Sequence, residues 1–210
     1  MDGKTPGQVR LVTRSLPGVC RSRGVARGLH LGLSELAFDL RNGTDTGVDP
    51  PRHEGTNPLV FAELLARLGP EATRGGFLDF GAGKGRALLL AARHGFPVVV
   101  GVERSAELCA IAERNVARWL RRRPGPFVEV HHADVRDFPV PDDITVGYLF
   151  NPFGPDTVRV AIDRILASLW RAPRPFHVVY AHPRCADLFV GAGFTPVHRQ
   201  GTDGTVLRHG

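Results

Sequence analysis

The chain has 210 residues, a hydrophobic content of 42% and a formal net charge of +6 at pH 7. This length suits one domain with a sizeable core, and the composition excludes a disordered or fibrous protein. No apolar run is long enough for a membrane span, and the three scattered cysteines favour reduced thiols, so we expect a cytoplasmic protein without a membrane partner.

Most of the net positive charge lies at the N-terminus. Residues 1–30 hold six cations and one anion, which accounts for +5 of the total of +6, and they show no apolar period. This pattern predicts a mobile basic tail over residues 1–30. Because the rest of the chain carries little net charge, nucleic acid is an allowed partner but not a favoured one.

Residues 31–70 are predicted to form a helical segment in front of the main domain. Apolar residues at helical spacing predict a helix over 31–40, and polar turn residues follow at 42–47. Asn57 and Pro58 have the chemistry of a helix cap and a first helical turn, and Gly69-Pro70 predicts the end of that helix.

Residues 71–210 alternate between strand-like and helix-like patterns. Such alternation indicates an α/β domain with a parallel sheet covered by helices on both faces. The predicted strands lie at 77–80, 97–102, 127–132, 144–150 and 176–180, and a closing hairpin is predicted at 194–199 and 205–208. The predicted helices lie at 86–93, 105–120, 155–169 and 185–190.

A glycine-rich turn follows the first of these strands. Asp79 lies in the strand, and glycines occupy positions 81, 83 and 85. A dinucleotide site needs a further glycine where Arg86 stands, and a phosphate-binding P-loop needs Ser or Thr where Gly85 stands. Both of these ligand classes are therefore disfavoured.

An acid two residues before a G-x-G-x-G turn resembles the first motif of the class I S-adenosylmethionine-dependent methyltransferases. The longer stretch 79–92 is similar to a bacterial group of these enzymes whose substrates are mostly unassigned. The resemblance implies a Rossmann-like, doubly wound, mostly parallel seven-stranded sheet with a C-terminal antiparallel hairpin. It also implies that residues 71–210 bind S-adenosylmethionine, through Asp79, Gly81, Ala82, Gly83 and Gly85.

Two more strand ends carry groups expected at the cofactor. Glu103 ends the second strand, where a carboxylate can accept hydrogen bonds from ribose hydroxyls, and Arg104 follows it. Asp134 follows the third strand and is expected to accept from the adenine amino group, with Asp137 as a nearby rival. The alternative for Glu103 is a helix-start carboxylate that favours the helix dipole.

Asn151, Pro152 and Phe153 follow the fourth strand, where the methyl acceptor is expected. Amino-group methyltransferases of nucleic acids and of protein glutamine carry a similar Asn/Asp-Pro-Pro-aromatic motif there, and non-SET histone lysine methyltransferases carry Asn-Asn-Phe. We therefore expect these three residues to be catalytic, Asn151 also to contact the cofactor, and the acceptor to be an amino nitrogen. Phe153 and Gly154 depart from the first motif, and a structural Asn-Pro turn is the alternative.

The stretches 45–47 and 53–58 resemble a segment that folds over the cofactor in the same bacterial group. Glu54, Thr56 and Asn57 are expected to line this lid. The arginines at 118 and 121–123 are expected to form a solvated helix end, and no spacing of Cys or His suggests a metal site.

The expected activity is methyl transfer from S-adenosylmethionine to an unidentified acceptor, which is a small molecule, a protein or RNA. One alternative is an RNA- or protein-modifying enzyme that uses the basic tail to hold its substrate. A second is a non-catalytic S-adenosylmethionine-binding module, which the intact glycines and Glu103 disfavour. A nicotinamide oxidoreductase is disfavoured by Arg86.

Overall fold

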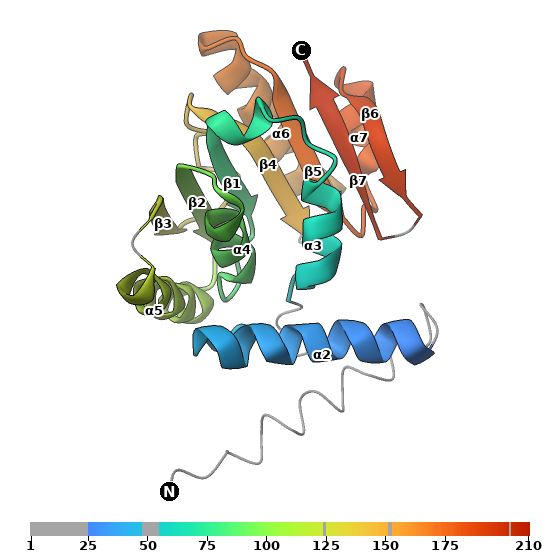
Figure 1. Ribbon diagram of the computed structural model, residues 1–210. Helices are drawn as coiled ribbons and strands as arrows, with labels where there is room; N and C mark the ends of the chain where they lie inside the picture. The colour runs from blue at the N-terminus through green and yellow to red at the C-terminus, as the bar shows by residue number, and fades with distance from the viewer. Residues whose placement is uncertain (1–24, 48–54, 124, 151–152, 202) are drawn as a thin grey trace, which may run out of the picture.

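The expected strands pair into one seven-stranded sheet in the computed structural model, which describes residues 25–47, 55–123, 125–150, 153–201 and 203–210 (Figure 1). Most of the predicted basic tail, residues 1–24, lies outside the described residues. The strands are β1 (Gly76–Phe80), β2 (Val98–Glu103), β3 (Phe127–His132), β4 (Ile144–Phe150), β5 (Phe176–Ala181), β6 (Thr195–Gln200) and β7 (Gly204–His209).

The strand order is β3-β2-β1-β4-β5-β7-β6. Strands β1 to β5 pair in parallel, and β7 runs antiparallel to both β5 and β6. The predicted doubly wound sheet with a C-terminal antiparallel hairpin is therefore confirmed. The direction of winding reverses between β1 and β4, where Asp79 lies beside Tyr148. Ligands of open α/β sheets bind in the crevice at this kind of reversal.

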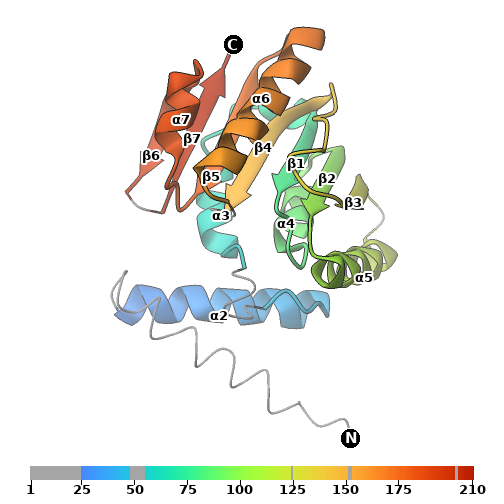
Figure 2. The ribbon, with the colours of Figure 1, turned by 180° about the vertical axis from the view of Figure 1, so that it is seen from behind.

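Helices cover both faces of the sheet (Figures 1 and 2). One face carries α3 (Pro58–Leu65), α4 (Arg86–His94) and α5 (Ala106–Arg122), and the other carries α6 (Pro155–Arg171) and α7 (Ala186–Gly191). A short 3-10 helix, η1 (Ala72–Arg74), precedes β1. Each face of the sheet holds its own apolar cluster. Every residue of β1 and β5 is buried, which explains why these strands are apolar except for Asp79 and His177.

Helix α2 (Val25–Asn42) lies across the carboxyl ends of the parallel strands rather than on a face of the sheet (Figure 1). Leu31 and Phe38 are buried and belong to the apolar cluster shared with α3 and α4. The boundary expected after residue 30 falls inside this helix. Apolar periodicity reveals only the turns that pack on the core, so it missed the first turns of α2.

Helix α3 begins as predicted but ends earlier. The Asn57 side chain accepts a hydrogen bond from the Leu59 N–H at 3.0 Å, which confirms the predicted cap. The helix ends at Leu65, before the predicted stop at Gly69-Pro70, because the N–H groups of Arg67 and Leu68 bond three residues back and tighten the last turn.

Candidate active site

A pocket of about 770 Å³ opens at the carboxyl ends of β1, β2, β3 and β4. We call it the strand-end pocket. It brings together residues that the sequence analysis selected from separate stretches of the chain. Those residues are Thr56, Asp79, Gly81, Ala82, Gly83, Glu103, Arg104, Asp134 and Phe153. The glycine turn, the second strand end and the third strand end therefore face one cavity.

The glycine turn is held open by backbone hydrogen bonds to β2. The N–H groups of Gly81 and Ala82 both donate to the Val102 carbonyl, each at 2.9 Å. Gly83 has a φ of +54° and Gly85 a φ of +86°, a region that L side chains rarely adopt. Gly85 comes directly before α4. A Cβ at this position would lie 3.2 Å from the Cβ of Ala112, so the absence of a side chain lets the turn pack directly on α5.

Glu103 is oriented by two backbone donors. Its Oε2 accepts from the Gly83 N–H at 2.9 Å, and its Oε1 accepts from the Ser105 N–H at 2.8 Å. An ionised carboxylate has about four acceptor sites, so about two remain for a ligand in the strand-end pocket. The orientation of this carboxylate is therefore set before any ligand binds.

Asp79 is a carboxylate buried in the wall of the pocket. Its side chain belongs to a residue that is 3% exposed, and burial raises its pKa well above the usual range. The negative charge of Glu103 raises the pKa further. A cationic group of a ligand placed beside Asp79 would stabilise the ionised form and reverse this effect.

Asp134 forms a tight pair with Arg136 in the loop after β3. Its Oδ1 accepts from the Arg136 N–H at 2.9 Å and from Nε at 3.0 Å, and its Oδ2 accepts from Nη2 at 2.7 Å. These hydrogen bonds lower the pKa of Asp134 to about 2, so the carboxylate is ionised at neutral pH. Both residues line the strand-end pocket, and the rival Asp137 is not among the described lining residues.

Of the three residues of the predicted acceptor motif, Phe153 is the one that the structure describes, and it lines the pocket. Asn151 and Pro152 lie outside the described residues. Phe153 lines the pocket together with Phe150, Gly154 and Thr157, and it also packs on the apolar cluster beneath α6. The end of the pocket beyond β4 is therefore aromatic.

Tyr148 on β4 is a pocket residue that the sequence analysis missed. It is 1% exposed, and its hydroxyl lies 3.0 Å from Thr56 Oγ1. Burial raises the pKa of the phenol, which stays protonated. A phenol inside a mostly apolar strand needs a hydrogen-bonding partner, and this requirement could have identified Tyr148 as a candidate from the sequence. Of the predicted lid residues, Thr56 lines the pocket, Asn57 caps α3, and Glu54 lies outside the described residues.

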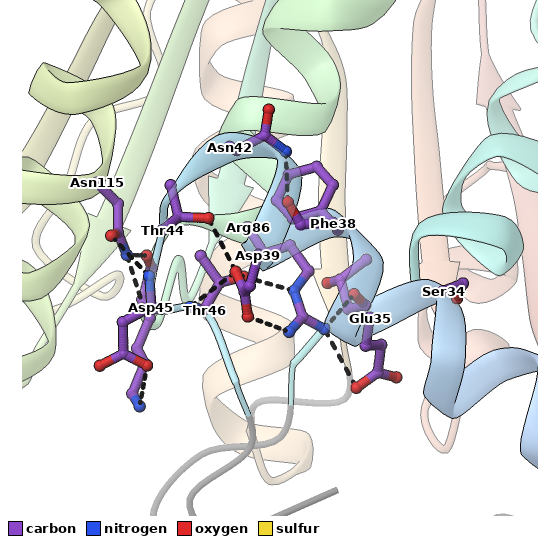
Figure 3. A network of polar contacts seen from close by, with 12 residues as sticks. Ser34, Glu35, Phe38, Asp39, Asn42, Thr44, Asp45, Thr46, Arg86 and Asn115 are labelled. Atoms are coloured by element: carbon purple, nitrogen blue, oxygen red, sulfur yellow. Dashed lines mark hydrogen bonds and ion pairs between the residues drawn. The ribbon is translucent and has the colours of Figure 1, made fainter. Parts of the chain in front are cut away.

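Arg86 is the second missed residue, and it was used only to exclude a dinucleotide ligand. It is 2% exposed, lines the pocket, and makes its polar contacts with α2 and the loop after it (Figure 3). Arg86 could have been identified from the sequence, because it stands at the first position of α4, where the helix dipole disfavours a cation. A cation at that position needs compensating partners elsewhere in the fold.

The arginines at the end of α5 are exposed, as expected for a solvated helix end, and three of them also contact the end of α2. Arg118 Nη1 donates to the Gly43 carbonyl. Arg122 Nη1 donates to the Asn42 carbonyl at 3.3 Å, and Arg123 Nη1 donates to Asn42 Oδ1 at 2.8 Å. Cations at the C-terminal end of a helix interact favourably with its unpaired carbonyls, so Arg118 and Arg122 stabilise the end of α2.

Within the described ranges, no helix is long and apolar enough to cross a membrane. Over the same residues, no group of three or more His, Cys, Asp or Glu side chains is arranged to hold a metal ion.

Residues 77–175 match the family model of a methyltransferase domain. A search of curated proteins returned no match. Among solved structures, a proposed RNA methyltransferase from Pyrococcus horikoshii has 19% identity and a TM-score of 0.56, with 83% of this chain and 95% of that chain covered.

Two other solved structures share the fold at similar distance. The N-methyltransferase NodS from Bradyrhizobium japonicum has 14% identity and a TM-score of 0.50, with coverage of 70% of this chain and 92% of that chain. The ribosomal protein L11 methylase from Lactobacillus delbrueckii subsp. bulgaricus has 16% identity and a TM-score of 0.51, with coverage of 71% and 75%. Residues 77–175 are therefore similar to a methyltransferase domain, and the seven-stranded sheet has the fold of the class I S-adenosylmethionine-dependent methyltransferases.

Proposed function

We propose that the strand-end pocket binds S-adenosylmethionine and that the protein transfers its methyl group to an amino nitrogen. The observation that carries the proposal is the convergence of Asp79, Glu103 and Asp134, from three different strand ends, on one pocket beside the glycine turn. A core role could explain each acid alone, but it does not explain why all three face the same cavity.

The three acids match three parts of the cofactor. Glu103 has acceptor sites left for the ribose hydroxyls after it binds two backbone N–H groups. Asp134 is ionised and lines the pocket, and we assign it to the adenine amino group, with the Val135 N–H next to it in sequence. Asp79 is buried and forms no ion pair with a cation among the described residues, and the ammonium group of the methionine moiety would supply one.

The chemistry asks the protein mainly for positioning. When bound, S-adenosylmethionine supplies a sulfonium methyl group for in-line displacement by a nucleophile. The acceptor must therefore be held in line, with its lone pair unprotonated. The carboxylates that line the pocket among the described residues are the three assigned to the cofactor, so we infer that the amine arrives neutral or loses its proton to water.

The amino-nitrogen acceptor rests on the motif at positions 151–153. We propose that the Asn151 side-chain oxygen and the Pro152 carbonyl accept hydrogen bonds from the amine and that Phe153 packs on it. The aromatic lining at Phe150 and Phe153 supports a flat or apolar acceptor surface. We also propose that residues 31–70 form a lid at the cofactor edge, because α2 crosses that edge and Thr56 lines the pocket.

Two measurements test the proposal. Titration calorimetry should show binding of S-adenosylmethionine and of its demethylated product to the purified protein. Labelled methyl transfer should then be screened on amino groups of proteins, nucleic acids and small amines. Asn151→Ala should keep cofactor affinity and lower turnover, because the amide acts on acceptor geometry and not on cofactor binding. Full turnover by Asn151→Ala would reduce the motif to a structural turn and remove the preference for nitrogen.

A further inference from the structure

The contacts of Arg86 point to a role beyond those assigned so far. The guanidinium lies between two cavities, because Arg86 lines both the strand-end pocket and a second pocket of about 430 Å³ beneath α2. Three separate stretches reach it. Figure 3 shows helix α2 and the loop that carries Thr46, and the third is the loop that carries Thr56.

Helix α2 supplies the charge that allows Arg86 to be buried. Arg86 Nη2 donates to Asp39 Oδ2 at 3.4 Å, and Nη1 lies 3.3 Å from Glu35 Oε2. A buried guanidinium without a counter-charge is strongly destabilising, so these two carboxylates hold the side chain in place. Asp39 is itself fixed, because its Oδ1 accepts from Thr44 Oγ1 at 2.8 Å and from the Thr46 N–H at 3.1 Å.

The remaining donors of Arg86 hold the loops that form one pocket wall. Nε donates to Thr46 Oγ1 at 2.7 Å, and Nη1 donates to the Thr56 carbonyl at 3.1 Å. The fit is close, because a Cβ at Gly55 would lie 2.9 Å from Arg86 Nη1. Thr56 then lies 3.0 Å from the Tyr148 hydroxyl, and both of these residues line the strand-end pocket.

We propose that Arg86 is a positioning residue for the cofactor: it holds Thr56 against Tyr148, and α2 supplies the carboxylates that keep the guanidinium in place. A continuous chain of polar contacts thus runs from Asp39 to the pocket wall (Figure 3 shows its α2 end). The docking of α2 and the affinity for cofactor are then coupled in both directions. This inference rests on the proposed cofactor site.

The central variant is Asp39→Asn, which keeps the size of the side chain and removes the negative charge that faces Arg86. We expect affinity for S-adenosylmethionine and for S-adenosylhomocysteine to fall about tenfold by calorimetry. The matched control is Asp142→Asn. It removes a surface ion pair, between Asp142 and Arg171 at 2.7 Å, whose side chains are each 45% exposed and do not line the strand-end pocket. This control should stay within about twofold of the wild-type affinity.

Fluorine NMR separates positioning from general stabilisation. The chain has two tyrosines, Tyr148 and Tyr180, so protein labelled with 3-fluorotyrosine gives two resonances that Tyr148→Phe assigns. In Asp39→Asn the Tyr148 resonance should shift or broaden, while Tyr180, which packs against Phe189 on the opposite face of the sheet, should not change. Arg86→Lys should retain more affinity than Arg86→Met, because lysine keeps the charge.

Thr56→Val provides a second variant if Asp39→Asn does not fold. It should reproduce the change at Tyr148 and the loss of affinity, and it should add nothing when combined with Asp39→Asn, because both break the same chain of contacts. Wild-type affinity and an unchanged Tyr148 resonance in either folded variant would overturn the inference. If the wild-type protein binds neither ligand, the proposed function fails instead, and the fluorine spectra still decide whether the chain of contacts through Arg86 exists.

Discussion

Glu103 offers the sharpest test of the cofactor assignment. We expect Glu103→Ala to remove the acceptors for the ribose hydroxyls. It also removes the acceptor of the Gly83 N–H, at 2.9 Å, and that of the Ser105 N–H, at 2.8 Å. Losing the ribose bonds should cost about 1–3 kcal/mol, so the affinity for S-adenosylmethionine should fall roughly 5- to 150-fold.

Glu103→Gln is a less clean substitution than it first seems to be. Both carboxylate oxygens accept hydrogen bonds from backbone N–H groups. In glutamine an NH₂ group replaces one of these oxygens, so two hydrogen-bond donors would face each other at that position. We therefore expect Glu103→Gln to weaken binding as well, in contrast to the usual near-neutral effect of an isosteric change on a surface.

The assay is titration calorimetry of folded variants with S-adenosylhomocysteine and with its 2′-deoxy analogue. The wild-type protein should prefer the ribose form, and Glu103→Ala should bind the two ligands with nearly equal affinity, because the discriminating acceptor is gone. A variant that keeps the wild-type affinity, or keeps the full preference for ribose, would refute the assignment of Glu103 and favour a purely structural role at the start of α5.

Three further predictions follow from the same structure. Gly83→Val should weaken cofactor binding in calorimetry more than Glu103→Ala does, since φ is +54° there and the side chain would enter the pocket; equal or better affinity would contradict this. Bonds from Arg136 lower the pKa of Asp134 to about 2, so their stabilising effect should be present above about pH 4 and lost as the pH falls towards 2. Asp134→Asn should accordingly lower the melting temperature at pH 5 but not at pH 2, and an equal effect at both would rule this out. A chain that begins at Gly28 should fold and bind cofactor with unchanged affinity, because it keeps Leu31, Phe38 and the carboxylates of α2; an insoluble product would show that the first turns of α2 are required.

Several features of the fold could be predicted because their causes are local. Short, mostly apolar runs marked β1, β2, β4 and β5, whose residues are largely buried. The glycines at 83 and 85 marked a turn with positive φ, and Asn57 marked a cap whose donors lie two and three residues away. In a parallel sheet the strand ends share one edge, so Glu103 and Asp134 could be placed near the glycine turn without any coordinates.

The contacts around α2 could not be predicted in this way. Arg86 binds Thr46, which is forty residues away in sequence, and Thr56 contacts Tyr148, ninety-two residues away. Sequence periodicity shows which residues are buried but not which polar groups meet. The same limit applies to the arginines of α5, which are exposed as expected but whose contacts with the end of α2 no local pattern indicated.

The sequence by itself thus determined the order of strands and helices and the position of the glycine turn, since these depend on spacings of a few residues. Only the tertiary structure decided that α2 crosses the carboxyl edge of the sheet and that a buried arginine joins it to the pocket wall. The physical reason is that a buried cation is tolerated only where the fold brings distant carboxylates to it, and no local pattern specifies that meeting.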